Sequence, residues 1–240
     1  MVSLPLAGVR VVVTGASRGV GESVARAAVE AGAFVALVAR GRDALDRVVA
    51  ALGAQAVAVP CDLLDAAATD LAAAAVAEAL GGPPRIVVNS AGIFSLAPLR
   101  ETDPGEFVAA MTLNVVAPFR FVRAFLGGML AAGEGHVVTI GSVADRLAFP
   151  GNGAYAASKF AARALHEVLR AETRGTGVRA TLVSPGPVDT ALWDSVDSAG
   201  HPGLPSRAQM LGPDDVARAV LFALTQPVAV NIDEMRLSRA

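Results

Sequence analysis

Seven short runs rich in valine, isoleucine and leucine are separated by longer alanine-rich stretches, and this alternation restricts the possible fold more than any other feature of the chain. Most of the runs are unbroken apolar segments, which is typical of strands buried on both faces of a parallel sheet. Amphipathic helices between such strands cover the two faces. The sequence therefore predicts an α/β, doubly wound fold with seven parallel strands at residues 9–15, 34–39, 55–60, 85–92, 136–142, 178–186 and 228–237.

The stretches between these strands carry ordinary helix signals. Residues 71–80 form an alanine-rich helical pattern, and residues 103–106 predict a capping box with proline at the first helical position. Residues 212–213 indicate a similar start for the last helix. No linker rich in proline and serine interrupts the alternation, so residues 1–240 are expected to form one domain.

Residues 187–211 depart from this alternation, because they contain neither a clean strand nor a long helix. Long irregular segments in compact domains are often lids or binding loops, and this one follows the end of the sixth predicted strand. We expect it to be a substrate loop. Trp193, the only tryptophan in the chain, lies in it and either packs the loop down or contacts the substrate.

Composition and charge exclude several classes of protein. Apolar residues make up 53% and charged residues 18% of the chain, as in a compact globular protein. The net charge is -2 with no basic tract, which argues against nucleic-acid binding. No uninterrupted apolar run reaches the roughly 18 residues of a membrane span, and the N-terminus lacks the layout of a signal peptide. A cytoplasmic protein without a membrane partner is expected.

Cysteine and histidine usage gives no sign of a metal site. Cys61 is the only cysteine, so an internal disulfide and a cysteine-rich zinc site are excluded, and we expect it to be a small buried residue at a strand end. The three histidines, His136, His166 and His201, are far apart and lack ligand spacing. We therefore predict no metal.

A glycine-rich turn joins the first predicted strand to the first helix. Gly15, Gly19 and Gly21 allow a tight turn and a close approach of the backbone to a ligand, and the helix N-terminus offers free N–H groups to a pyrophosphate. No lysine follows the turn, which excludes a nucleotide triphosphate loop. In this position the turn favours a Rossmann-type dinucleotide fold over a purely structural turn.

The choice of dinucleotide depends on the end of the second strand. NAD-binding folds place an acidic residue there, but here no acid occurs before Asp43. Arg18 and Arg40 instead offer charge to a 2′-phosphate, which arginine binds bidentately. The sequence thus favours NADP(H) over NAD(H), unless these arginines are ordinary surface residues of an arginine-rich chain.

Tyr155 and Lys159 are the only tyrosine and the only lysine in the chain. Their spacing of four residues places both side chains on one face of a helix, about one turn apart. Arginine would serve a surface ion pair equally well, whereas lysine is a compact charge whose pKa can shift. The pair therefore indicates a shared chemical task rather than a chance pair on a solvated face.

Together these motifs make the chain similar to the classical short-chain dehydrogenase/reductase family along essentially its whole length. The resemblance is carried, in order, by Thr14-Gly15-x-x-x-Gly19-x-Gly21, Asp62, Asn89-x-Ala91-Gly92, Asn114, Ser142, Tyr155-x-x-x-Lys159, Pro185-Gly186 and Thr190. It implies reversible hydride transfer between NADP(H) and a small-molecule carbonyl compound or secondary alcohol, as in a carbonyl reductase or alcohol dehydrogenase.

The resemblance also assigns roles to residues. Tyr155 would be the general acid and base, Ser142 would hydrogen-bond the substrate oxygen, and Lys159 would hold the nicotinamide ribose, with Asn114 positioning a water beside the lysine. The lysine charge, with that of oxidised nicotinamide, is expected to lower the tyrosine pKa from its usual value of about 10. The implied cofactor-binding residues are Thr14, Gly15, Ser17, Arg18, Gly19, Val20, Gly21, Arg40, Asp62, Leu63, Asn89, Ala91, Gly92, Tyr155, Lys159, Pro185, Gly186, Val188 and Thr190.

Other expectations concern the substrate and the assembly. The pocket wall is expected to include Phe94, Val143, Phe149 and Trp193. Helices around residues 104–131 and 152–174 would pair copies of the chain into a homodimer or homotetramer. The C-terminal residues 228–237 resemble the ending of NADP-dependent 3-hydroxy-acid and serine dehydrogenases of the family.

Two positions depart from the family pattern, and two further functions stay open. Ser90 replaces a second asparagine, and Asp145 stands where the family often has glycine, so its carboxylate either shapes substrate choice or points to solvent. One alternative is reduction of a 3-oxoacyl thioester on a carrier protein, with a basic patch formed by Arg100, Arg146 and Arg207. The other is a sensor that binds NADP(H) without chemistry.

Overall fold

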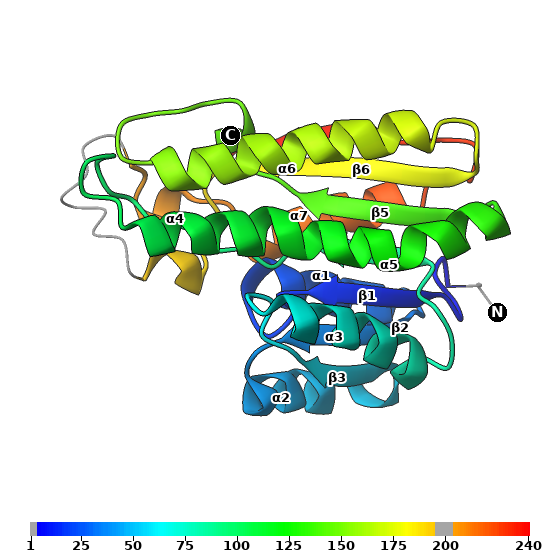
Figure 1. Ribbon diagram of the computed structural model, residues 1–240. Helices are drawn as coiled ribbons and strands as arrows, with labels where there is room; N and C mark the ends of the chain where they lie inside the picture. Colours follow the sequence, from blue (N-terminus) through cyan, green and yellow to red (C-terminus); the bar gives the residue numbers. More distant parts are fainter. Residues whose placement is uncertain (1–3, 195–203) are drawn as a thin grey trace.

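The computed structural model describes residues 4–194 and 204–240 and contains one seven-stranded sheet (Figure 1). All strand pairs are parallel, and the strand order is β3-β2-β1-β4-β5-β6-β7. The predicted α/β, Rossmann-type doubly wound fold is therefore confirmed. The strands are β1 Arg10–Thr14, β2 Phe34–Ala39, β3 Ala56–Pro60, β4 Ile86–Asn89, β5 Gly135–Ile140, β6 Val178–Pro185 and β7 Glu234–Leu237.

The last strand is shorter than the sequence predicts. Residues 228–230 do not pair with the sheet, because a turn closed by the bond from Val230 N to Pro227 O (2.8 Å) leaves both valines exposed. Asn231 then takes the place of a strand partner, since its side chain bonds both the N–H and the C=O of Ala180 at 3.1 Å. Only Glu234–Leu237 pairs with β6.

Helices cover both faces of the sheet. One layer contains α1 Gly19–Glu30, α2 Arg42–Leu52 and α7 Pro213–Leu224, and the other contains α3 Ala66–Ala79, α4 Pro104–Met111, α5 Ala117–Ala132 and α6 Gly153–Glu172. In Figure 1, α4, α5 and α6 lie in front of the sheet and α7 behind it. Alternate side chains of β1 enter the two cores: Val11 and Val13 face the first layer, and Val12 faces the second.

The helices α4 and α5 are continuous through a π-helical segment, Thr112–Val116. At the start of α4, the Asp103 carboxylate accepts hydrogen bonds from the N–H groups of Gly105 (2.7 Å) and Glu106 (3.2 Å). This is the capping half of the predicted box. The long helix predicted over 104–131 is thus present, and its π-helical segment lies next to the cavity described below.

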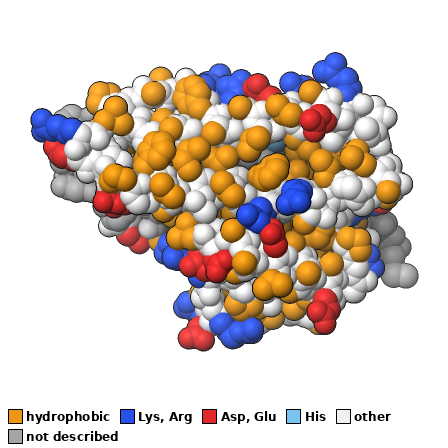
Figure 2. Space-filling model, in the orientation of Figure 1, with side chains coloured by type: hydrophobic (Ala, Val, Ile, Leu, Met, Phe, Trp, Pro, Cys, Tyr) orange, Lys and Arg blue, Asp and Glu red, His pale blue; other side chains and the backbone are white. Residues whose placement is uncertain are grey.

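The helix Pro104–Ala132 is the one span in the described part of the chain with the length and hydropathy of a membrane helix; an 18-residue stretch of it has a mean hydropathy of 1.5. Phe121 and Phe125 on one side are buried against the sheet. Its other side, together with α6, carries exposed apolar side chains that gather over α4, α5 and α6 in Figure 2. They include Phe107, Val108, Val116, Phe119, Phe160, Leu165 and Val168.

Candidate active site

A cavity of about 790 Å³ lies at the C-terminal edge of the sheet. Residues that follow all of the strands from β1 to β6 line it. In a doubly wound sheet, ligands bind at this edge, next to the point where the strand order reverses. Here that point lies between β1 and β4, because the chain runs outward from β1 to β3 on one side and from β4 to β7 on the other. The cavity therefore lies where a dinucleotide fold would hold its ligand.

Most of the predicted site residues form the wall of this cavity. Those that line it are Gly15, Ser17, Arg18, Gly19, Val20, Gly21, Arg40, Asp62, Leu63, Ala91, Gly92, Phe94, Ser142, Val143, Phe149, Tyr155, Lys159, Pro185, Gly186, Val188, Thr190 and Trp193. Thr14, Asn89 and Asn114 lie behind the wall, where all three side chains are buried.

The glycine turn has the backbone geometry that the sequence predicted. Gly15 and Gly19 have φ values of 69° and 60°, a region that side chains disfavour. A Cβ atom on Gly15 would lie 2.7 Å from Ala91 Cα, and one on Gly21 would overlap the Gly15 carbonyl. No side chain caps the start of α1, so the N–H groups of its first turn are available to a phosphate. This cradle fits the pyrophosphate of a dinucleotide.

Thr14 and Asn89 support the turn from below. The Thr14 hydroxyl accepts hydrogen bonds from the N–H groups of Ser90 (3.1 Å) and Ala91 (3.2 Å), which joins the end of β1 to the loop after β4. Both polar atoms of the Asn89 amide are buried without a partner among the described residues. Ser90, which departs from the family pattern, uses its backbone N–H for the contact with Thr14, so the contact does not depend on its side chain.

Three exposed arginines surround the end of the cavity near β2. Arg18 and Arg40 were predicted there, and Arg47 of α2 joins them. None of the three forms an ion pair with a described carboxylate, whereas Arg42 pairs with Asp46 at 3.8 Å. Their positive charge is therefore available to an anionic ligand.

The Ser142 hydroxyl lies directly after β5. It caps the short helix Val143–Asp145 by accepting a hydrogen bond from Ala144 N (3.1 Å). Because the oxygen accepts this bond, the hydroxyl proton can be donated on the cavity side, where Tyr155 is one partner. The turn thus orients Ser142 as a donor.

Asn114 has no free polar group that points into the cavity. Its amide oxygen accepts from Ile93 N (2.9 Å), and its amide nitrogen donates to Ile93 O (3.1 Å) and to the Ser158 hydroxyl (2.9 Å). Ser158 in turn donates to Tyr155 O at 2.7 Å. The π-helix therefore connects the β4 loop to the first turn of α6, and Ser158, which sequence reasoning missed, completes this link.

Tyr155 and Lys159 meet on the face of α6 that borders the cavity. The Lys159 Nζ lies 5.7 Å from the centre of the Tyr155 ring and donates a hydrogen bond to Ile140 O (2.9 Å). Burial lowers the pKa of Lys159 to about 8, although the charge of Asp145 opposes this fall. The helical spacing thus places the ammonium beside the phenol ring, as predicted.

The expected direction of the tyrosine shift is wrong for the chain by itself. Burial raises the pKa of Tyr155 to about 12; a hydrogen bond with Ser142 opposes the rise, and the negative charge of Asp145 adds to it. At neutral pH the Tyr155 hydroxyl is therefore protonated, and it is a proton donor rather than an acceptor.

An aromatic wall faces this pair. The Phe94 ring lies 4.8 Å from the Tyr155 ring and 5.0 Å from the Trp193 ring, measured between ring centres. Trp193 thus both packs the loop and faces the cavity. Sequence reasoning missed other apolar lining residues of this region, which are Ile93, Leu113, Ile140 and Leu147. Leu192, Leu204 and Pro205 also line it, and they belong to the loop of residues 187–211 that was expected to bind substrate.

Arg47 was also missed, although a local signal for it exists. Ala44 and Arg47 are three residues apart on α2 and both line the cavity, so helical periodicity puts them on one face. The missed apolar residues of the cavity wall have no local periodicity of this kind, because they come from segments far apart in the sequence.

The loop of residues 187–211 is held at its two ends. Asp189 N donates to Leu211 O (2.8 Å), and Leu211 N donates to Pro187 O (2.9 Å). Arg207 donates to Asp189 (2.6 Å) and to Asp194 (2.5 Å), so it binds its own loop. Residues 195–203, which include His201, lie outside the described part of the chain.

The basic patch proposed for a carrier protein is not formed by the three candidate arginines. Arg207 is neutralised as above, Arg100 pairs with Glu101 (2.9 Å), and Arg146 pairs with Asp145 (2.7 Å) and Glu234 (2.6 Å). The Asp145 carboxylate itself is buried and points neither to solvent nor into the cavity. The alternative in which Asp145 points to solvent is therefore wrong, and an effect of Asp145 on substrate choice stays a prediction.

Known proteins similar to this chain in sequence and structure are dehydrogenases and reductases. A sequence model described as short chain dehydrogenase matches residues 9–200. Glycine betaine reductase ATRR of Emericella nidulans is 39% identical over 237 residues, which are 96% of this chain but 19% of that protein. The chain thus spans about a fifth of the length of this relative.

Two solved structures share the whole fold. One is an alcohol dehydrogenase from Thermococcus sibiricus in complex with 5-hydroxy-NADP, with a TM-score of 0.84, 30% identity and coverage of 97% of both chains. The other is the closed form of a serine dehydrogenase in complex with NADP+, with a TM-score of 0.84 and 28% identity over 95% of this chain and 93% of that one.

Proposed function

The chain belongs to the short-chain dehydrogenase/reductase family, and we propose that it is an NADP(H)-dependent carbonyl reductase, with Tyr155 as its proton donor. The observation that carries this proposal is the position of Tyr155, Ser142 and Lys159 in one cavity with the glycine cradle of residues 14–21. A phosphate cradle and a buried proton donor in one cavity suit hydride transfer coupled to protonation.

The proposed steps use groups whose state the structure defines. NADPH, when bound, supplies the hydride. The Ser142 hydroxyl, already oriented by Ala144 N, donates a hydrogen bond to the carbonyl oxygen of the substrate. The Tyr155 hydroxyl, protonated at neutral pH, gives its proton to the same oxygen as the alcohol forms. Lys159 lies beside the ring and stabilises the phenolate that remains.

The pKa values favour reduction as the direction at neutral pH. Reduction needs a protonated tyrosine, and burial keeps it protonated by raising its pKa to about 12. Oxidation of an alcohol needs the phenolate, which becomes available only at higher pH. We therefore expect the rate of oxidation to rise with pH over a range in which the rate of reduction does not.

A preference for NADP(H) is supported by the arginines at the β2 end of the cavity. Arg18, Arg40 and Arg47 offer three unpaired guanidinium groups where a 2′-phosphate would lie. Among the described residues that line the cavity, Asp62 carries the one carboxylate, and its Oδ1 already accepts a hydrogen bond from Leu64 N (3.1 Å). The structures of the alcohol and serine dehydrogenases in complex with NADP or its 5-hydroxy derivative agree with this preference.

The substrate is proposed to be a small or medium uncharged carbonyl compound. Phe94, Val143, Phe149 and Trp193 form an apolar surface beside Tyr155, and Arg207 is occupied by Asp189 and Asp194. Reduction of a 3-oxoacyl thioester on a carrier protein is less well supported, because the three candidate arginines pair within the chain. A sensor without chemistry is disfavoured by the retention of both Tyr155 and Lys159.

We further propose that the protein forms homodimers or homotetramers through α4, α5 and α6. The exposed apolar side chains on these helices gather on one face in Figure 2. Such a face is a usual sign of self-association in a protein of this size.

The test is NADPH consumption by the wild type and by Tyr155→Phe with a panel of carbonyl compounds: β-keto esters, 3-oxoacyl thioesters, α-diketones, aldehydes and ring ketones. Turnover that falls by about 10²-fold or more in the variant supports the mechanism. Thr225→Val is the matched control, because it removes a hydroxyl at the end of α7, far from the cavity. Equal turnover by wild type and Tyr155→Phe would refute the role of Tyr155.

A further inference from the structure

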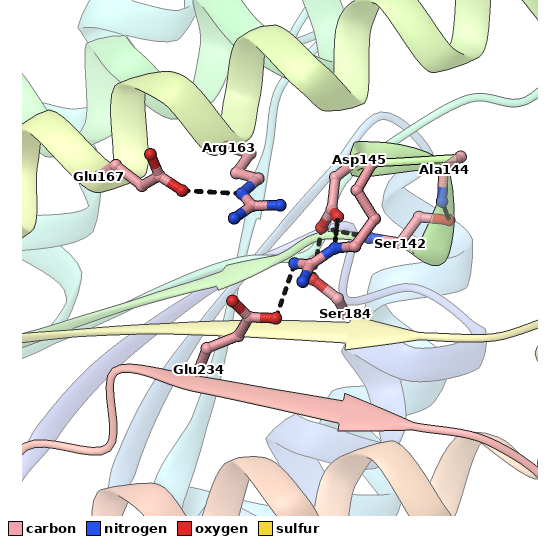
Figure 3. Close-up of polar contacts among 8 residues, drawn as sticks. Ser142, Ala144, Asp145, Arg163, Glu167, Ser184 and Glu234 are labelled. Atoms are coloured by element: carbon pink, nitrogen blue, oxygen red, sulfur yellow. Dashed lines mark hydrogen bonds and ion pairs between the residues drawn. The ribbon is translucent and has the colours of Figure 1, made fainter. Parts of the chain in front are cut away.

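An ionic cluster around the buried carboxylate of Asp145 lies behind the candidate active site. Figure 3 shows Asp145 with its carboxylate turned toward Ser142 and Ser184 and joined through a guanidinium to Glu234. The guanidinium is that of Arg146, whose Nε lies 2.7 Å from Asp145 Oδ1 and whose Nη2 lies 2.6 Å from Glu234 Oε1. The Asp145 side chain is fully buried, while Arg146 and Glu234 are partly exposed.

Asp145 holds the backbone at Ser142. Its Oδ2 accepts a hydrogen bond from Ser142 N (3.5 Å) and another from the Ser184 hydroxyl of β6. Gly141 makes room for this carboxylate, because a Cβ atom there would lie 2.7 Å from both Asp145 Oδ2 and Ser184 Oγ. Asp145 ends the short helix Val143–Asp145, and its side chain also holds the backbone at Ser142, where the helix starts.

Arg146 and Glu234 attach this helix to the last strand. The sequence separation between the two residues is long, and their ion pair joins the loop after β5 to β7 at the edge of the sheet. The hydrogen bond to Asp145 raises the pKa of Arg146, and the bond to Glu234 raises it further, so the guanidinium stays charged. The charge of Glu234 pairs with that of Arg146 at the partly exposed side of the cluster, and the charge of Asp145 is the buried one.

The two groups of α6 that share the cavity face this charge. The charge of Asp145 acts on both Tyr155 and Lys159, where it favours the protonated form. Burial lowers the pKa of Lys159 to about 8, so the lysine is close to losing its charge near neutral pH. The charge of the Asp145 carboxylate opposes this loss.

We propose that Asp145 is a positioning residue for the proposed reductase: it fixes the Ser142 turn against β6 and β7, and its negative charge adds to the effect of burial on Tyr155 and opposes the effect of burial on Lys159. The inference rests on the proposed function for its kinetic consequence only. Its electrostatic consequence can be tested on the protein without any turnover, because Tyr155 is the only tyrosine in the chain.

The first experiment is a pH titration of the near-ultraviolet tyrosinate absorption, which reports Tyr155 alone. Trp193 fluorescence of the same samples marks the pH at which the fold is lost. Asp145→Asn removes the charge and retains an acceptor for Ser142 and Ser184. We expect Tyr155 of this variant to ionise at lower pH than in the wild type, with the fold intact.

Glu167→Gln is the matched control. Glu167 is a carboxylate of α6 that is drawn in Figure 3, but it pairs with Arg163 (2.7 Å) on the half-exposed side of the helix. This variant should titrate like the wild type. If Asp145→Asn also titrates like the wild type, or keeps its tyrosine protonated until the fold is lost, the electrostatic part of the proposal is wrong.

The second experiment separates positioning from charge by kinetics. Asp145→Asn should lower kcat for carbonyl reduction by about tenfold or more, while the Kd for NADPH changes little, because the glycine cradle is not touched. Glu234→Gln breaks the attachment to β7 but keeps the charge of Asp145. It should lower kcat without moving the pH at which Tyr155 ionises.

The outcomes distinguish this inference from the proposed function. If the wild type reduces none of the carbonyl compounds, the proposed function fails, yet the tyrosinate titration still tests Asp145. If the wild type is active and Asp145→Asn shows only a lower melting temperature, with unchanged kcat and an unchanged Tyr155 titration, Asp145 is a structural residue and the inference is overturned.

Discussion

Two buried histidines should make the protein sensitive to mild acid. His136 Nε2 lies 2.8 Å from Thr181 Oγ1, and His166 Nδ1 lies 3.0 Å from Thr139 Oγ1. Burial lowers the pKa of His136 to about 3, helped by the charge of Arg179, and burial lowers that of His166 to about 4. Both rings are therefore neutral in the folded protein at any pH above about 5.

The sign of the effect follows from these depressed values. Unfolded histidine has a pKa of about 6.5, so below that pH the unfolded chain takes up two protons that the folded chain does not. The stability that depends on neutral rings is fully present above pH 6.5 and is lost as the pH falls toward 4 and 3. At pH 5, each histidine lowers the free energy of unfolding by up to about 2 kcal/mol relative to pH 8, and the two together lower it by about 4 kcal/mol.

This loss is large against the roughly 5–15 kcal/mol by which proteins of this kind are stable. Urea denaturation of the wild type at pH 8, 7, 6 and 5 should show the free energy of unfolding fall with pH. The double variant His136→Gln, His166→Asn keeps a polar atom near each threonine but cannot titrate. We expect its free energy of unfolding to change by less than half as much over the same range.

The single variant His166→Asn provides the internal control, since it should remove about half of the pH dependence. A double variant whose free energy of unfolding falls between pH 8 and pH 5 as steeply as that of the wild type would refute the reasoning. The pH dependence would then come from groups other than His136 and His166.

Three further predictions test the fold and the cofactor site. Arg40→Ala should raise the Kd for NADPH by about tenfold or more and leave that for NADH nearly unchanged, measured by fluorescence titration; equal effects on both would contradict the proposed 2′-phosphate contact. Phe121→Ala should lower the free energy of unfolding by about 3–5 kcal/mol, because Phe121 is the largest fully buried side chain, and a loss below about 1 kcal/mol in urea denaturation would contradict its place in the core. Thr14→Val leaves the N–H groups of Ser90 and Ala91 without their acceptor, so it should cost about 1–3 kcal/mol and weaken NADPH binding, whereas an unchanged melting temperature would show that these bonds are dispensable.

Sequence spacing predicted the backbone geometry and the relative positions of residues around the cavity where the signal is local. The spacing of Tyr155 and Lys159 and the glycines of residues 15–21 are set within one or two helical turns, and their geometry follows from the backbone alone. The same holds for the strands, because a buried parallel strand is recognisable from its own residues. The roles assigned to these residues remain predictions for the experiments above.

Local signals failed where a residue is defined by distant partners. The apolar run at residues 228–230 looks like a strand, but Asn231 binds Ala180 and delays pairing to Glu234. Arg146 looks like a surface cation available to a partner protein, until Glu234 and Asp145 are seen to hold it.

The sequence by itself determined the α/β class and the parallel sheet, because these depend on periodicity within single segments. The family resemblance supplied most of the residues expected at the C-terminal edge of the sheet. Only the tertiary structure decided the environment of Asp145 and the pKa of Tyr155. Asp145 is buried against Ser184, which is 39 residues away, and the tyrosine pKa depends on how much water and charge the surrounding elements leave beside the ring. Burial and long-range electrostatics belong to the packed chain, and no short stretch of sequence encodes them.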